Sequence, residues 1–434
     1  MPKHQYHIGT MYNILKGDIR HLPPVIVFTV ISISVYQFGW GFADPFFSLY
    51  LGEFSSKYAV IGLFITLATV MGFIALIPLG ALLDRISHHK IINFAKLTYI
   101  FIGLAYFCAG EFRSIPILVV ALLLNGAFSA MVWTGTAATI RGKSTEKNSG
   151  LSFGFYVTAN RIMYALGLGL ALWVVGRFPI HYIFIPVIIF PAFSILLSQN
   201  RDEAGKQTVR AALKALIVED KIVGRVYNDV KQFNAEMWAM YAMFFCSYAI
   251  IPMAFSFIPL YALSLGYNIV EVGLITLVMN IPFLFSFISA EIADRSERLR
   301  NIIIGLGISS ISLALLSIWH TNDWMLFAMS FLLVAGYSII LPSLSSVITV
   351  MTPKKFMGTS SAMIDMTMFG AMMVFPPFIG ELIDGRGWDI AFMVIGLYLG
   401  ILVIMTLFFQ LVFKRRNIRY HHENPETKKN PYVL

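Results

Sequence analysis

The chain has 434 residues, of which 58% are hydrophobic and 13% charged, and its formal net charge is +9. Soluble domains carry about 25% charged residues, so this composition excludes an ordinary water-exposed globular protein. The apolar residues form continuous blocks of about 20 residues or more, the length that a helix needs to cross about 30 Å of hydrocarbon.

Helix is the expected structure of these blocks, because a backbone in lipid must satisfy its own hydrogen bonds. The short alternating segments of a membrane barrel are not seen in the sequence. We predict an all-α membrane protein with twelve spans, near residues 23–51, 58–83, 91–109, 115–140, 149–175, 179–198, 237–264, 269–293, 301–319, 324–351, 357–383 and 388–413.

The polar segments between the blocks divide the chain. The first residues lack the apolar core and cleavage site of a signal peptide, so we interpret them as a cytoplasmic leader. Residues 199–236 combine charges with helically spaced apolar residues, which predicts a surface helix that joins two halves. The predicted domains are a leader (1–22), a first six-helix bundle (23–198), a cytoplasmic linker with an amphipathic helix (199–236), a second six-helix bundle (237–413) and a basic cytoplasmic tail (414–434).

Lys and Arg predict the orientation. Most of the 32 basic residues fall in segments that are cytoplasmic if both termini lie inside. The opposite loops hold only Lys57, Arg113, Arg177 and Arg386. This is the positive-inside asymmetry, and it explains the net charge without a nucleic-acid partner. The expected surroundings are the lipid bilayer of the cell membrane, with the basic tail against anionic headgroups.

An internal repeat links the two halves. "AVIGLFITL" (59–67) matches "VEVGLITLV" (270–278), which places Gly62 and Gly273 at an offset of 211. "LLDRISHHK" matches "EIADRSERLR", and "LLLNGAFS" matches "LLVAGYS", at offsets within one residue of that value. Two parallel copies of six helices are a known plan of transporters.

The stretch "PLGALLDRISHHKII" (78–92) places charges where the second span leaves the lipid. Gly80 permits close helix contact. Asp84 opposes the dipole at the end of its own helix, so it needs a partner elsewhere. A partner that is held in one conformation and released in another would act as a latch.

These residues carry a family resemblance. Gly80, Asp84 and Arg85, the repeated pair Asp294–Arg295, the twelve spans and the long central segment resemble the major facilitator superfamily. The resemblance implies alternating access, with a central cavity between two rocking bundles, and a cytoplasmic latch. The implied latch residues are Gly80, Asp84, Arg85, His88, Asp294, Arg295 and Arg298.

Several positions depart from the family pattern. His88 stands where the family usually carries arginine, so the latch is either pH-sensitive or an ordinary weakened loop. Asn125 stands where proton-driven members often carry arginine, and "LGLGLA" (166–171) lacks the proline typical of efflux antiporters. These departures argue against a simple drug/proton antiporter.

Three charged residues fall inside the predicted spans: Asp44, Arg161 and Asp365. A charge at mid-bilayer costs at least about 2.5–3.5 kcal/mol, so it usually faces the bundle interior. Arg161 lies about 12 residues, or about 18 Å, from the inner end of its span and needs an anionic or polar partner. Asp44 or Asp365 could pair with it, either as a switch during transport or as a permanent buried pair. Lys96 lies nearer a span end, and we expect it to extend toward the surface.

Tyr36, Trp40 and Asp44 share one helix face, with Gln37 beside it. A carboxylate beside aromatic rings can bind a cation or carry a proton, although Asp44 could also simply be exposed to water at the end of the span. The other candidate cavity residues serve either as substrate contacts or as helix-to-helix hydrogen bonds. They are Asn125, Tyr156, Asn160, Asn280 and Tyr337.

The expected function is secondary transport of a small organic solute, coupled to protons, by a monomer without a cofactor. No phosphate-binding loop for ATP is present in the sequence, and no spacing within a span suits a zinc enzyme. Asp44 favours efflux of lipophilic or cationic compounds, whereas Arg161 favours uptake or exchange of an organic anion. A non-transporting sensor on the same fold is a further alternative.

Overall fold

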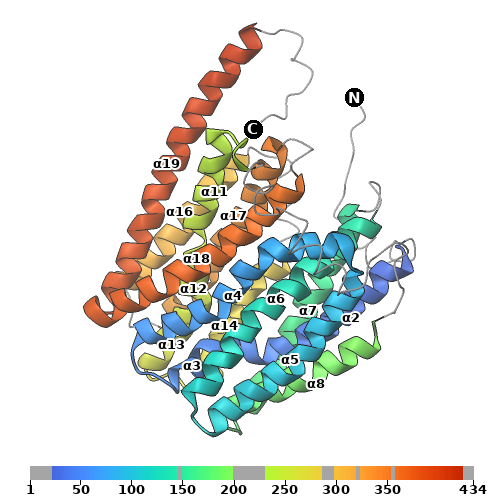
Figure 1. Cartoon of the computed structure of the whole chain (residues 1–434). Coiled ribbons are helices and arrows are strands. Elements are labelled where there is room, and N and C mark those ends of the chain that lie inside the picture. The colour runs from blue at the N-terminus through green and yellow to red at the C-terminus, as the bar shows by residue number, and fades with distance from the viewer. Residues whose placement is uncertain are drawn as a thin grey trace. The chain divides into compact units, whose positions relative to one another are not determined.

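The computed structural model describes residues 22–144, 149–198, 230–285, 298–318, 323–352 and 357–423. Every regular element in these ranges is a helix, which confirms the predicted all-α class (Figure 1). The predicted latch residues Asp294 and Arg295 lie outside the described residues, as do the leader up to residue 21 and most of the linker.

The described residues before 199 form nine helical elements. They are α2 (Pro24–Ala43), η2 (Asp44–Phe46), α3 (Phe47–Gly52), α4 (Tyr58–Arg85), α5 (His88–Glu111), α6 (Ile115–Lys143), α7 (Ser149–Val175), η3 (Ile180–Ile183) and α8 (Phe184–Leu196). After residue 229, the described elements are α11 (Ala235–Ser247), α12 (Ile250–Pro252), the π-helix η4 (Met253–Phe257), α13 (Ile258–Ser264), α14 (Ile269–Leu284), α16 (Arg298–Ile318), α17 (Asp323–Met351), α18 (Met357–Arg386) and α19 (Trp388–Glu423).

Ten helical stretches among the described residues are long and apolar enough to cross a membrane. Two shorter apolar helices, Ile180–Leu196 and Ile269–Leu284, fall in two further predicted spans. The apolar, helical character of the chain is therefore confirmed. The number of spans and the side on which the termini lie remain predictions.

The internal repeat is reflected in the positions at which helices begin and are interrupted. α4 begins at Tyr58 and α14 at Ile269, which is the predicted offset of 211. The first long stretch of each copy is also interrupted, by η2 at Asp44–Phe46 and by η4 at Met253–Phe257. Pro45 explains the first break, because proline has no N–H to donate within a helix. The same offset aligns Asp44 with Phe255, so the carboxylate belongs to the first copy alone.

The chain forms two compact units. Unit 1 comprises Met1–Asp44 and Pro78–Asp220, and unit 2 comprises Pro45–Ile77 and Lys221–Leu434. The chain passes between the units three times, and two of these crossings lie at a proline, Pro45 and Pro78. The predicted domains follow chain order instead, and they stay a prediction.

Unit 1 is built around two sets of helix contacts. α2 packs against α7 and α8, and α5 packs against α6 and α8. Ser32 of α2 and Ser194 of α8 fasten one of these contacts, because each hydroxyl donates to the other residue's carbonyl, at 2.6 Å and 2.5 Å. Such hydroxyl bonds hold helices together in lipid, where apolar surface gives little driving force.

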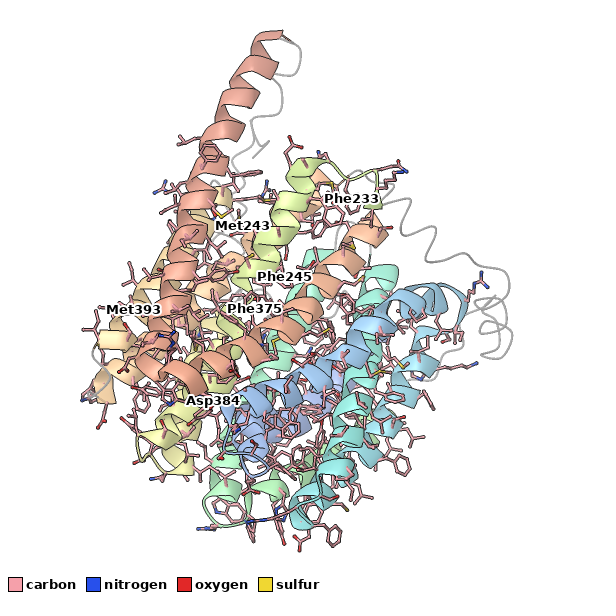
Figure 2. The ribbon with its side chains drawn as sticks, turned by 60° about the vertical axis from the view of Figure 1, so that its left-hand side comes forward. Phe233, Met243, Phe245, Phe375, Asp384 and Met393 are labelled. Carbon is pink, nitrogen blue, oxygen red and sulfur yellow. The ribbon has the colours of Figure 1, made fainter. Side chains whose placement is uncertain are left out.

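Unit 2 uses both apolar and polar contacts. α16 packs against α17 and α19, α14 against α17, and α11 against α18. Figure 2 shows Phe245 of α11 and Phe375 of α18, whose ring centroids lie 5.4 Å apart. Ser310 of α16 donates to the carbonyl of Gly396 in α19 at 2.7 Å.

The start of α4 packs closely on α18 within unit 2. A side chain at Gly380 of α18 would clash with the backbone at Tyr58, and one at Gly62 of α4 would clash with the backbone at Pro376. Asp384, labelled in Figure 2, accepts hydrogen bonds from the backbone N–H groups of Tyr58 at 3.0 Å and Ala59 at 2.8 Å. The free N–H groups of α4 are therefore capped by a residue 326 positions away in the chain.

Candidate functional site

The candidate site lies where α2 and α7 cross in unit 1. Gly41 and Gly167 bring the two backbones into contact: an added Cβ at Gly167 would lie 3.1 Å from Cα of Gly41. An added side chain at Gly41 would clash with the carbonyl oxygen of Tyr164. Because only glycine permits this approach, the side chains near the crossing are brought within hydrogen-bonding distance. Asp44 and Tyr164 are two of them.

Asp44 has two partners on α7. The Oη of Tyr164 donates to Oδ2 of Asp44 at 2.9 Å. Arg161, one turn earlier on α7, interacts electrostatically with both groups. Tyr164 is buried, Arg161 is partly exposed and Asp44 is exposed. The structure thus brings two of the three predicted intramembrane charges together, through a tyrosine.

Two buried amide atoms lie on the same faces of these helices. Gln37 precedes Asp44 by two turns on α2, and Asn160 precedes Tyr164 by four residues on α7. Ser34 donates to Oδ1 of Asn160 at 3.4 Å. Oε1 of Gln37 and Nδ2 of Asn160 have no hydrogen-bond partner among the described residues. An unsatisfied buried polar atom costs about 1–3 kcal/mol, so each of these two atoms would be stabilised by a polar partner.

An aromatic cluster joins α2 to α5 and lies beside the carboxylate. Nε1 of Trp40 donates to Oη of Tyr36 at 2.8 Å. The ring of Tyr99 in α5 meets those of Tyr36 and Trp40 edge-on, with centroids 5.2 Å and 5.5 Å apart. Oη of Tyr99 in turn donates to Oδ1 of Asn125 in α6 at 2.9 Å. Tyr36 and Asn125 therefore join helices in this structure, and the ring of Tyr36 is covered by protein.

The prediction for Lys96 is wrong. Its side chain is 1% exposed, and Nζ donates to Oγ of Ser32 at 2.7 Å. The lysine does not extend to the surface, because α5 begins at His88 and Lys96 faces α2 and α8 two turns later. The charge lies inside unit 1, beside the serines that join α2 to α8.

The remaining predicted cavity residues lie elsewhere. Tyr156 is a buried residue of α7 in unit 1. Asn280 lies in α14, where its amide donates to the carbonyl four residues earlier at 2.9 Å. Tyr337 of α17 meets two aromatic rings edge-on at 5.9 Å and 6.3 Å. Asp365 lies in the first half of α18, partly exposed. The last three belong to unit 2.

The predicted latch is described only in part. Arg85 ends α4, His88 begins α5 and Arg298 begins α16. Nε2 of His88 lies 3.0 Å from the carbonyl oxygen of Leu83, so it ties α5 back to the last turn of α4. Gly80 and Asp84 lie in α4, but the surroundings of Gly80 and the side chain of Asp84 are outside what the structure describes. The latch role of these residues stays a prediction.

Three residues of the site were not predicted from the sequence: Tyr164, Tyr99 and Ser32. Tyr164 follows Arg161 by three positions, so helical spacing places it beside the arginine. Tyr99 bears the same relation to Lys96 in α5. A search for hydroxyl groups one turn from an intramembrane charge would have found both.

Comparison with known proteins identifies the family. The sequence profile of the Major Facilitator Superfamily matches residues 29–289 and 271–432. A search of curated proteins gave no match.

Solved transporters share the fold. A structure of a POT family transporter in complex with a thioalcohol-conjugated peptide aligns with a TM-score of 0.71 at 13% identity, over 92% of this chain and 99% of that one. The nucleoside transporter NupG aligns at 0.70 and 12%, over 88% and 99%. The human organic anion transporter MFSD10 (TETRAN) aligns at 0.64 and 11%, over 88% and 100%. With the profile matching nearly the whole chain, this protein is a transporter of the major facilitator superfamily.

Proposed function

We propose that this protein couples the movement of a small organic anion to protons, by alternating access in the cell membrane. In this proposal, Arg161 binds the anionic group and Asp44 carries the proton. The observation that supports it is the grouping of Asp44, Tyr164 and Arg161 inside apolar helices.

The coupling follows from charge balance. An ionised Asp44 neutralises Arg161, and in a medium of low dielectric constant each charge needs the other. When Asp44 takes up a proton, Arg161 needs a new anion. A substrate carboxylate supplies it, since arginine offers a planar pair of donors that matches a carboxylate. The proton and the anion therefore bind together and are released together.

Neutral contacts can add selectivity. Gln37 offers an acceptor and Asn160 a donor on the faces that carry Asp44 and Arg161. A substrate with a hydroxyl or amide group beside its carboxylate would satisfy both. A substrate that lacks these groups would leave the two amides unsatisfied, which weakens binding.

A cationic substrate fits the arrangement less well. Asp44 already has Arg161 as a counter-charge, so a cation would have to displace it. The rings of Tyr36 and Tyr99 are each 1% exposed and contact each other. They are not open to a ligand, so Tyr36 cannot offer a cation the aromatic contact that the sequence predicted.

The test is transport in liposomes that contain the purified protein. A panel of organic anions, lipophilic cations, nucleosides and peptides is offered with and without an inward proton gradient. We expect an anion to accumulate only with the gradient. Arg161→Ala should weaken anion binding by about ten- to a hundredfold, since hydrogen bonds to charged groups contribute about 1.5–3 kcal/mol. Arg177→Ala, which removes an exposed arginine, is the matched control.

Asp44→Asn separates the two roles. It should abolish accumulation driven by protons but preserve exchange of labelled for unlabelled anion, which moves no net proton. Transport of a cation that survives Arg161→Ala would overturn the proposal in favour of a cation carrier. A complete lack of flux across the panel would favour a sensor.

A further inference from the structure

Lys96 is a further charged residue within the apolar helices, and the proposed mechanism does not use it. It lies between α5, α2 and α8 in unit 1, and 1% of its side chain is exposed. Its Nζ makes one hydrogen bond among the described residues, to Oγ of Ser32 at 2.7 Å. Since a lysine ammonium carries three donors, this partner leaves most of its hydrogen-bonding capacity unused.

The helices around Lys96 bring no carboxylate to it. α2 presents Ser32 and, one turn on, Tyr36, while α8 presents Ser194 and has no titratable residue between its ends. The basic residues of α6 lie at its C-terminal end. The acid of α5 is Glu111, at the far end of that helix, where it pairs with His181 of η3 at 2.9 Å.

A buried ammonium without a carboxylate is costly, whereas a neutral amine beside a serine is tolerated. The charge of Lys96 therefore depends on whether water or another proton-carrying group reaches it. In this it differs from Arg161, which keeps its charge in any protein setting.

Polar groups connect Lys96 to the candidate site. Polar or aromatic residues recur at every fourth position along α2 and into the first residue of η2, over about 18 Å of helix: Ser32, Tyr36, Trp40 and Asp44. Tyr99 lies one turn from Lys96 on α5 and packs against Tyr36 and Trp40. We call this row the α2–α5 polar column. It replaces aliphatic packing with hydroxyl and indole groups between the lysine and the carboxylate.

We propose that Lys96 is a second proton-binding site of the transporter, placed at the Ser32 end of the α2–α5 polar column. The inference rests on the proposed proton coupling and adds to it. It assigns one more proton to each transport cycle than Asp44 alone would carry.

The first test measures proton stoichiometry in liposomes, from the proton gradient that just balances an opposing substrate gradient. Lys96→Met should carry one proton fewer per substrate than the wild type, while exchange of labelled for unlabelled substrate stays unchanged. Lys96→Arg, which cannot release its proton, should show the same loss. Lys57→Met, at an exposed lysine, is the control. Unchanged stoichiometry in Lys96→Met would overturn the inference and leave the role of Asp44 standing.

The second test does not require transport. Thermal unfolding in detergent is recorded from pH 5 to pH 9 for the wild type, Lys96→Met and Lys57→Met. Other titrating groups contribute equally to all three, so the difference isolates Lys96. We expect the wild type to lose stability relative to Lys96→Met as the pH falls from 9, because the solvated lysine of the unfolded chain binds a proton more readily than the buried amine. The loss should level off once the buried amine is also protonated. Parallel curves would overturn the inference even if no substrate had been found.

Discussion

Asp384 is predicted to hold the start of α4 in place. It accepts from the N–H groups of Tyr58 and Ala59, which belong to the first turn of α4 and have no partner within that helix. Replacing Asp384 with alanine removes both hydrogen bonds and the negative charge at the positive end of the helix dipole.

The magnitude follows from known capping energies. Loss of an N-cap side chain costs about 0.5–2 kcal/mol. A carboxylate at an exposed helix N-terminus contributes about 0.3–1 kcal/mol through its interaction with the helix dipole. We expect Asp384→Ala to lower the free energy of unfolding by about 1–2 kcal/mol. Asp384→Asn should cost about half as much, because the amide oxygen still accepts one hydrogen bond but carries no charge.

Thermal unfolding in detergent is the assay, at low and at high salt. For units of 150–250 residues, 1 kcal/mol shifts the midpoint by about 2–4 °C. Glu381→Ala is the control, since Glu381 is an exposed acid one turn earlier on the same helix. The effect of Asp384→Ala should shrink in high salt, because the contact is exposed. Equal midpoints for Asp384→Ala and Glu381→Ala would refute the reasoning.

Other predictions concern packing and caps. Gly380→Ala places a methyl group against the backbone at the start of α4 and should cost about 1–3 kcal/mol, whereas Gly385→Ala meets no atom within 4 Å and should be neutral or stabilising in the same unfolding assay. Gly41→Ala should separate α2 from α7 and reduce both the unfolding midpoint and substrate binding. Tyr164→Phe removes the hydrogen bond to Asp44 and should shift the pH dependence of transport without loss of the folded protein. Asn268→Ala removes the N-cap of α14 and should lower stability by about 1 kcal/mol, measured by the same midpoint.

The helices and the family could be predicted from the sequence because lipid leaves the backbone few options. Runs of apolar residues had to be helical, and a charge inside such a run had to face protein or water. The same argument identified Asp44, Arg161 and Asp365 as the charges that need partners. It could not choose between Asp44 and Asp365 as partner, since that depends on how α2 and α7 are rotated about their axes.

Lys96 shows where position along the chain misleads. Its distance from the span end allowed the side chain to reach the surface, but α5 turns this residue toward Ser32. The glycines that allow α2 and α7 to cross closely could not be recognised from the sequence either. "GWGF" and "LGLGL" both read as flexible apolar sequence, and only the structure shows Gly41 against Gly167.

The cap on α4 has a consequence for biosynthesis. The repeated copy, α14, caps itself with Asn268, whose side chain accepts from the N–H groups of Val270 and Glu271. α4 must wait for Asp384, 326 residues later. At about 5–20 residues per second, a ribosome needs roughly 15–65 s to supply that residue. During this interval the nascent chain carries an incomplete α4, so a protein truncated before α18 should be recognised by quality-control proteases sooner than its own apolar content suggests.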